Sequence, residues 1–323
     1  MKIAIVGCGA LGSYYGAKLC QSGQDVHFLL RSDYEAVCQT GVTIHSIHGD
    51  FRVHPKCART PEEIGGCDLV LIGLKTTANN QFSNLLPSLV DPHTAVLTLQ
   101  NGLGNEQQLA RLFPAEQILG GLCFVCLNRP KPGIISHTAH GKILLGEFRG
   151  PAQPRTHEIA ELFRNVGVAC DVMDNLARAH WEKLVWNIPF NGVGVAGVAG
   201  YEALINPRST FHTPQPSHCL TTDILLAEPR WVELLRELML EVIATANALG
   251  LNIPESQADK QIERTRVMNA YKASTLIDFE RGQPLELETM FLEPLRQAQT
   301  VGVRTPRLKA LCRVLKQLDA PGK

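Results

Sequence analysis

A glycine-rich turn directly after an apolar run constrains the fold of this chain most. The run Lys2–Val6 leads into Gly-Cys-Gly-Ala-Leu-Gly, after which a helical pattern begins. In this strand–turn–helix setting Gly7 makes the tight turn, Gly9 lets the backbone approach a pyrophosphate, and Gly12 lets helix and strand pack closely. The helix start also offers unpaired amides to phosphates. The turn residues expected to bind a dinucleotide are Gly7, Cys8, Gly9, Ala10, Leu11 and Gly12.

The first half of the chain alternates short β-branched runs with longer helical patterns. Such alternation is typical of βαβ units and a parallel sheet. Predicted strands are Lys2–Val6, Asp25–Leu30, Leu69–Ile72, Ala95–Leu99, Gln117–Leu122, Lys142–Leu145 and Ala169–Met173. Predicted helices are Gly9–Ser22, Gln81–Leu89, Glu106–Leu112 and His157–Val166.

From Asp174 onward the pattern is helical. Predicted helices are Leu176–Trp186, Pro229–Leu249, Gln257–Asp278, Leu285–Thr300 and Pro306–Leu318, and Asn206–His218 has loop composition. We therefore expect an α/β fold in two domains. We expect residues 1–173 to form a Rossmann-type doubly wound parallel sheet with a dinucleotide site, and residues 174–323 to form an all-helical domain.

Composition excludes several classes of protein. The chain has 31 basic and 31 acidic residues, so no global field favours nucleic acid or an anionic membrane as partner. No apolar run approaches the length of a membrane span and no secretory signal is evident, which predicts a soluble, cytoplasmic protein. The ten cysteines are scattered, and the Cys123/Cys126 pair has no second pair at zinc spacing. We expect reduced structural cysteines and no metal.

The end of the second predicted strand bears on the choice of cofactor. An Asp or Glu there would bind the ribose diol of NAD, but this strand ends in Arg31-Ser32. A guanidinium matches a 2′-phosphate and a hydroxyl can donate to it, so NADPH is favoured over NADH. Lys75 follows the third strand and either adds a second charge or is a solvated loop lysine. Asp33 leaves NAD use open, although capping the next helix is its favoured role.

A second polar cluster lies in the helical half. Lys183, Asn187 and Asn191 are spaced four residues apart, so they follow one helix face. Pro189 is expected to kink this helix near Val185, which would put Asn191 beyond the bend. Two amides and an ammonium in one line are costly to bury without a ligand. A solvated polar stripe is the alternative.

Together these motifs resemble the ketopantoate reductases (2-dehydropantoate 2-reductases). The resemblance rests on the glycine turn, Arg31, Gln100-Asn101-Gly102, the Lys183, Asn187 and Asn191 series, Ser274-x-x-x-Asp278 and Glu286, in order along the chain, and on the segment 132–147. It implies NADPH-dependent reduction of 2-dehydropantoate to (R)-pantoate, a step toward pantothenate and coenzyme A.

The resemblance also implies roles for individual residues. Reducing a 2-keto acid needs a proton donor for the developing alkoxide, and Lys183 is the one group in its cluster that can serve. The resemblance makes Lys183 the general acid. Ser274 would then contact the substrate carboxylate and Glu286 its distal hydroxyl, although Glu286 could instead complement a helix dipole. The remaining expected substrate-binding residues are Asn101, which also binds cofactor, Asn187 and Asn191.

Two departures leave alternatives open. Tyr271 stands where better characterised relatives have Asn, and the Asn206–His218 segment is unusually long and proline-rich. The chain could reduce another 2-keto acid or resemble the opine or hydroxyacid dehydrogenases. A nonenzymatic NADPH sensor is less favoured, because a sensor needs no proton donor.

His137, His140 and His180 have no paired carboxylate or serine at readable spacing, so no charge relay is expected. The expected partner is a small 2-keto acid, and a homodimer stays open.

Overall fold

The chain forms two compact units, Met1–Ala179 and His180–Lys323. The computed structural model describes residues 1–206, 208–209 and 218–319. The two units divide within the first turn of helix α6 (Leu176–Ala196). A domain boundary at residues 173/174 remains our proposal.

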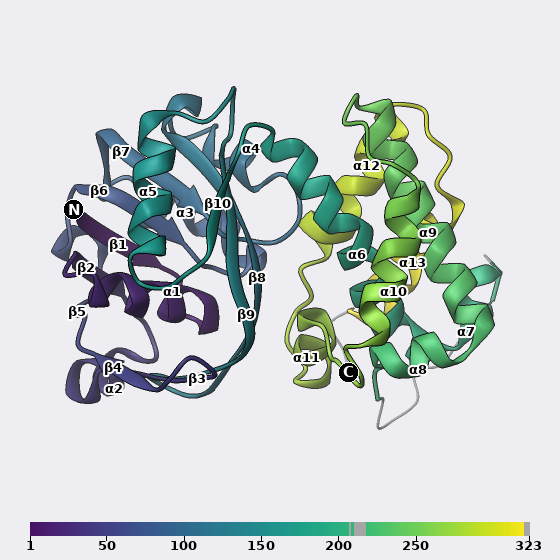
Figure 1. Cartoon of the computed structure of the whole chain (residues 1–323), viewed down its shortest axis with the longest axis horizontal. Coiled ribbons are helices and arrows are strands. Elements are labelled where there is room, and N and C mark those ends of the chain that lie inside the picture. Colours follow the sequence, from purple (N-terminus) through teal and green to yellow (C-terminus); the bar gives the residue numbers. More distant parts are fainter. Residues whose placement is uncertain (207, 210–217, 320–323) are drawn as a thin grey trace. The chain divides into compact units, whose positions relative to one another are not determined.

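The first unit is built on one ten-stranded, mostly parallel sheet (Figure 1). Its order is β4-β3-β9-β8-β7-β6-β1-β2-β5, and β10 pairs with β9. The β8–β9 and β3–β4 pairs are antiparallel. The strands are β1 (Lys2–Val6), β2 (Asp25–Leu29), β3 (Val42–Ser46), β4 (Phe51–Val53), β5 (Lys56–Ala58), β6 (Cys67–Ile72), β7 (Val90–Thr98), β8 (Ile118–Lys131), β9 (Ile134–Glu147) and β10 (Cys170–Met173).

Alternate residues of the central strands supply two separate cores. Ile3 and Ile5 of β1 point into one core, whereas Ala4 and Val6 point into the other. Residues of α1 (Ala10–Gln21) and α5 (Pro154–Arg164) complete the first core, and α3 (Phe82–Leu85) and α4 (Asn105–Leu109) contribute to the second. Burial on both faces is what makes these strands continuous apolar runs. The doubly wound sheet predicted from the sequence is confirmed.

The remaining turns and helices of the first unit are short. They are α2 (Tyr34–Thr40), η1 (Pro61–Glu63), η2 (Thr76–Gln81) and η3 (Ala115–Gln117). The sequence prediction missed α2 and the strands β3, β4 and β5, and it extended α3 four residues too far. The strands β4 and β5 have only three residues each, too few for a period-2 pattern to emerge.

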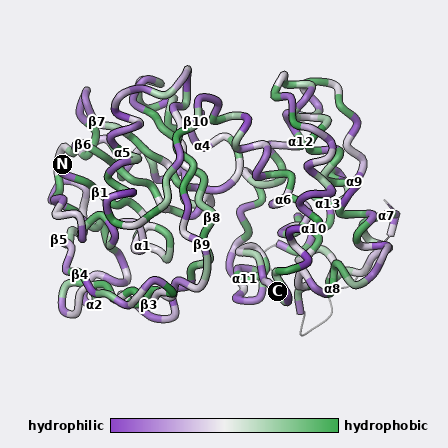
Figure 2. The backbone as a smooth tube through the Cα atoms, in the orientation of Figure 1, coloured by the Kyte–Doolittle hydropathy of each residue, from purple (hydrophilic) through white to green (hydrophobic). Residues whose placement is uncertain are grey.

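The second unit is helical, as predicted. It contains most of α6, η4 (Gly197–Ala199), α7 (Tyr201–Ile205), α8 (Thr222–Ala227), α9 (Pro229–Ala248), α10 (Ser256–Arg266), α11 (Ser274–Glu280), a π-helical turn η5 (Glu288–Leu292), α12 (Glu293–Thr300) and α13 (Pro306–Leu318). Hydrophobic and hydrophilic residues alternate along α9, which buries one face (Figure 2). Of the predicted loop Asn206–His218, residues 207 and 210–217 lie outside the described residues.

Three helix predictions in this unit need correction. Gln257–Asp278 is not one helix, because the chain leaves helical geometry between α10 and α11, where Asn269 has φ +54° and the backbone of Tyr271 bonds the Thr222 hydroxyl. Helix α6 does not end at Trp186. It continues through Pro189 to Ala196, because that segment is deeply buried and one lost backbone bond does not outweigh its packing.

The third correction concerns the segment Leu285–Thr300. Regular helix does not begin at Leu285, and a π turn at Glu288–Leu292 precedes α12. Pro294 has no amide to donate to the carbonyl of Met290, four residues earlier, so an α-turn is disfavoured there. In the parts of the chain that the structure describes, no helix has the length and apolarity needed to cross a membrane.

Candidate functional site

The glycine turn after β1 has the geometry that its spacing predicts. Gly7 has φ +96°, and a Cβ placed on it would lie 2.3 Å from the backbone nitrogen of Leu74. A Cβ on Gly12 would lie 2.2 Å from the carbonyl oxygen of Gly7. Neither position has room for a side chain, because the β1 turn, the start of α1 and the loop after β6 are in close contact.

Gly9 differs from its two neighbours. A Cβ built on Gly9 meets nothing within 4 Å, so this position opens onto free space. Gly9 is also the N-cap of α1, and no side chain caps the helix. The first amides of α1, including those of Ala10 and Leu11, therefore remain available to an anion. The turn fits a pyrophosphate, and Cys8, Gly9, Ala10 and Leu11 are the residues that would hold it.

The turn lies where the winding of the sheet reverses. From β1 the chain passes to β2 on one side, whereas β6 and β7 lie on the other. In open α/β sheets, ligands bind outside the carboxyl ends of the strands at such a point. The loop after β6 carries Lys75, which is exposed at the start of η2, and the loop after β7 carries the half-buried Asn101.

A chain of buried amides joins these two loops. Gln100 Nε2 donates to Leu74 O at 3.0 Å and to Asn79 Oδ1 at 2.7 Å. Asn79 Nδ2 donates to Asn105 Oδ1 at 2.9 Å, and Asn105 Nδ2 donates to Asn101 O at 3.1 Å. The network holds the Asn101 turn to the loop before Lys75. Sequence reasoning missed Asn79 and Asn105, whose sole signal was an excess of amides near the strand ends.

The segment after β2 contains the residues expected to select the cofactor. Arg31 and Ser32 are exposed, whereas Asp33 is buried. Asp33 occupies the N-cap position of α2, but its side chain makes no capping hydrogen bond. The predicted capping role of Asp33 is therefore wrong. Its carboxylate accepts a hydrogen bond from Ser32 Oγ at 2.9 Å and pairs with Arg129.

In the second unit, helix α6 carries the predicted polar row. Lys183 is half-buried, and Asn187 and Asn191 are 8% and 2% exposed. The row is therefore not a solvated stripe, since its exposure decreases steadily along the helix.

Asn191 connects this row to α11. Its Oδ1 accepts a hydrogen bond from the backbone amide of Thr275 at 3.1 Å, so it satisfies one of the open amides in the first turn of α11. Ser274, the preceding residue, begins that helix and is half-buried. The structure thus brings Asn191 and the Ser274 turn together, and it gives Asn191 a structural contact that sequence reasoning did not foresee.

Two further positions of the second unit complete the expected set. Glu286 is 6% exposed and stands just before the π turn. A π turn is rare and is often found at functional sites. Tyr271 packs its ring near that of Trp186 on α6, with centroids 6.1 Å apart. Tyr271 therefore lies close to the helix that carries Lys183.

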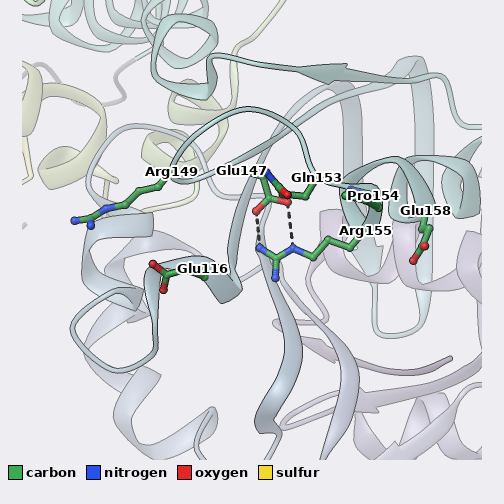
Figure 3. Close-up of a pocket in the computed structure, with 7 residues that line it drawn as sticks. All are labelled: Glu116, Glu147, Arg149, Gln153, Pro154, Arg155 and Glu158. Atoms are coloured by element: carbon green, nitrogen blue, oxygen red, sulfur yellow. Dashed lines mark hydrogen bonds and ion pairs between the residues drawn. The ribbon is translucent and has the colours of Figure 1, made fainter.

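A separate pocket lies at the other end of the sheet strands. Figure 3 shows its lining by Glu116, Glu147, Arg149, Gln153, Pro154, Arg155 and Glu158. Glu147 is buried, and its two carboxylate oxygens accept hydrogen bonds from Arg155. The Nε–Oε1 distance is 3.1 Å and the Nη2–Oε2 distance is 2.5 Å. Arg155 also lines a hollow with Met1 and Asp68, near the amino ends of β1 and β6. None of the site residues expected from the sequence lines this pocket.

His137 has contacts that its sequence spacing did not suggest. Its Nδ1 lies 2.8 Å from Ser46 Oγ and its Nε2 lies 2.9 Å from the carbonyl oxygen of His140. Since a carbonyl only accepts, Nε2 carries the proton and Ser46 donates to Nδ1. Burial lowers the pKa of His137, which favours the neutral ring. This serine and histidine are a structural pair on β3 and β9.

All ten cysteines are thiols outside any disulfide. Within residues 1–206, 208–209 and 218–319, no group of three or more His, Cys, Asp or Glu side chains could hold a metal ion.

Comparison with known proteins gives matches over nearly the whole chain. The family model "Ketopantoate reductase PanE/ApbA" matches residues 3–150, and its C-terminal counterpart matches residues 218–319. A 2-dehydropantoate 2-reductase from Nostoc sp. (strain PCC 7120) is 40% identical, covering 98% of this chain and 95% of the relative. The structure of a 2-dehydropantoate 2-reductase from Geobacter metallireducens is 48% identical, with a TM-score of 0.88 and coverage of 98% and 99%.

More distant structures share the fold. A ternary structure of D-mandelate dehydrogenase with NADH and anilino(oxo)acetate is 18% identical, with a TM-score of 0.82 and coverage of 99% and 98%. A dimeric ketopantoate reductase from Staphylococcus aureus is 19% identical, with a TM-score of 0.78 and coverage of 99% of each chain. At these identities the likeness concerns the fold alone.

Proposed function

Because the chain belongs to the ketopantoate reductase family, we propose that it reduces 2-dehydropantoate to (R)-pantoate with NADPH, a step toward pantothenate and coenzyme A. The observation that carries this proposal is the family match along both units together with an open dinucleotide turn at Gly9. Following NADPH oxidation with a panel of 2-keto acids that includes ketopantoate tests it directly. Absence of turnover with ketopantoate would overturn the substrate assignment.

The reduction needs a hydride at the ketone carbon and a proton at the ketone oxygen. When bound, NADPH supplies the hydride for the ketone carbon. Lys183 donates a proton to the oxygen of that carbonyl and stabilises its developing negative charge. Its half-buried position limits competing solvation and strengthens this interaction.

The other residues bind and orient. The amide side chain of Asn187, one turn from Lys183, is proposed to donate to the substrate, and the Ser274 hydroxyl is proposed to donate to its carboxylate. Glu286 accepts a hydrogen bond from the distal hydroxyl. Asn191 is proposed to support substrate binding indirectly, because its side-chain oxygen already accepts a hydrogen bond from the Thr275 amide at the start of α11.

On the cofactor side, the turn Gly7–Gly12 binds the pyrophosphate through its backbone. Arg31 is proposed to bind the 2′-phosphate, and Lys75 to add a second positive charge. Asn101, held by the amide chain, is proposed to contact both cofactor and substrate. A cytoplasmic location and a homodimer complete the proposal, and sedimentation of the purified chain tests the latter.

The exposed guanidinium of Arg31 gives a prediction for the cofactor. Removing a charge-assisted contact costs about 1.5–3 kcal/mol, so Arg31→Ala should raise the KM for NADPH roughly 10- to 100-fold and leave that for NADH nearly unchanged. Steady-state kinetics with both cofactors measures this, and Arg31→Lys should recover part of the loss. Equal use of NADH and NADPH by the wild-type protein would contradict this role of Arg31.

The buried Glu286 gives a prediction for the substrate. Ketopantoate carries a primary hydroxyl that 2-ketoisovalerate lacks, and a carboxylate bonded to that hydroxyl favours the first substrate. Glu286→Ala should lower kcat/KM for ketopantoate at least about tenfold and hardly change that for 2-ketoisovalerate. Measuring both substrates on one variant controls for instability, which depresses both. Equal losses would overturn the ketopantoate assignment and leave the reductase chemistry standing.

A further inference from the structure

The carboxylate of Asp33 is unusual for its position. It lies four residues after the end of β2, close to where NAD-binding folds place the acid that holds the ribose diol. Asp33 is only 5% exposed. Ser32 Oγ donates to Oδ1 at 2.9 Å, and Nη1 of Arg129, from β8, donates to Oδ2 at 2.5 Å. Both oxygens are therefore occupied.

The charge of Asp33 acts close to the dinucleotide turn. The pKa of the Cys8 thiol is raised well above its ordinary value, first by burial, then by Cys57 and by the Asp33 carboxylate. Cys8 stands between Gly7 and Gly9. Because the negative charge of Asp33 raises the pKa of Cys8, it would also repel a phosphate bound beside this turn, unless a cation neutralises the carboxylate.

Arg129 supplies such a cation. Its side chain is 40% exposed, whereas that of Asp33 is 7% exposed, so the pair lies at the edge of the surface with the carboxylate inside. Arg31, which precedes Asp33 by two residues, is exposed and lies on the same segment. The two arginines thus differ in role. Arg129 pairs with the Asp33 carboxylate, whereas Arg31 is the residue proposed to bind the 2′-phosphate.

We propose that Arg129 determines cofactor specificity by neutralising and occupying Asp33, which prevents this carboxylate from binding a ribose diol or repelling a 2′-phosphate. Arg129 is a positioning residue that acts through Asp33. This inference rests on the proposed preference for NADPH.

Fluorescence titration of the full-length chain with NADPH and with NADH tests the proposal through binding alone. In Arg129→Met the Asp33 carboxylate is released, and its repulsion should raise the Kd for NADPH at least about tenfold. The Kd for NADH should stay within about threefold of wild type or fall, because the diol gains an acceptor.

The double variant Arg129→Met/Asp33→Asn decides the mechanism. With the charge removed at both positions, the Kd for NADPH should return to within about threefold of wild type, and Asp33→Asn alone should keep wild-type affinity. Arg129→Lys, which keeps the charge, should retain most of the NADPH affinity. A double variant as weak as Arg129→Met would show that Arg129 acts directly on the phosphate or on the fold, and would overturn the proposal.

Arg155→Met is the matched control. It also leaves a buried carboxylate, Glu147, without its arginine, but near the amino ends of the strands. It should lower thermal stability as Arg129→Met does and leave the ratio of the two Kd values unchanged. If Arg155→Met shifts the ratio equally, instability explains both, and the proposal fails.

Failure of the proposed function has a different signature. A wild-type chain that binds NADH as tightly as NADPH contradicts the NADPH preference itself, before any variant is made. A normal wild-type preference with no response to Arg129→Met contradicts only the role of the Arg129–Asp33 pair.

Discussion

We expect the Lys183→Ala variant to reduce ketopantoate about 10²- to 10⁴-fold more slowly than the wild-type chain, the usual span for loss of a positioned acid. The alkoxide that forms on the substrate oxygen would then take its proton from water and lose its cationic neighbour. Because the cofactor contacts proposed above are made by the glycine turn, Arg31 and Lys75 and not by Lys183, the Kd for NADPH should change by less than about threefold. Steady-state kcat and a binding titration measure the two effects.

Lys183→Arg separates proton donation from charge. An arginine keeps the positive charge but does not give up a proton in this pH range, so its kcat should stay far below wild type. Thermal unfolding of both variants shows whether the half-buried stem of Lys183 is needed for stability. Near-normal turnover of Lys183→Ala with intact NADPH affinity would remove Lys183 from the mechanism.

The second large effect concerns two glycines three residues apart. Gly9→Ala should fold normally, since the new Cβ meets nothing within 4 Å, yet it should raise the Kd for NADPH roughly 100-fold by displacing the pyrophosphate from the helix amides. Gly12→Ala places a Cβ 2.2 Å from the Gly7 carbonyl oxygen. It should therefore destabilise the fold by about 2–4 kcal/mol.

Thermal unfolding without cofactor and NADPH titration separate the two variants. Gly9→Ala should keep the wild-type Tm, whereas Gly12→Ala should lose several degrees in the absence of any ligand. A Gly9→Ala variant that binds NADPH normally would show that the pyrophosphate does not lie over Gly9. A fully stable Gly12→Ala variant would contradict the close packing of α1 on the β1 turn.

The β1–turn–α1 segment was predictable because the sequence patterns that define it are local. The run Lys2–Val6, the glycine spacing and the helix up to Gln21 all lie within a short stretch, and the structure has them with almost the predicted bounds. The role of each glycine follows from backbone geometry that depends on near neighbours. Burial on both faces made the central strands visible as apolar runs in the same way.

Other features depend on residues far apart in the sequence. The Asp33 carboxylate was expected to cap α2, but Arg129, 96 residues away, takes it instead. Asn191 was expected to serve the substrate, and no sequence pattern indicated its bond to the Thr275 amide, 84 residues away. A helix pattern likewise did not reveal the break between α10 and α11, because backbone bonds to Thr222 hold the intervening segment.

The amide chain Gln100–Asn79–Asn105–Asn101 has a consequence for kinetic measurements. None of its members can gain or lose a proton near neutrality, so its hydrogen bonds keep the same strength across the usual range of buffers and are insensitive to added salt. These hydrogen bonds themselves therefore do not change the Asn101 turn during a titration of the enzyme. A bell-shaped rate profile of this chain would report the ionisation of reacting groups rather than a deformation of the loop that carries Asn101.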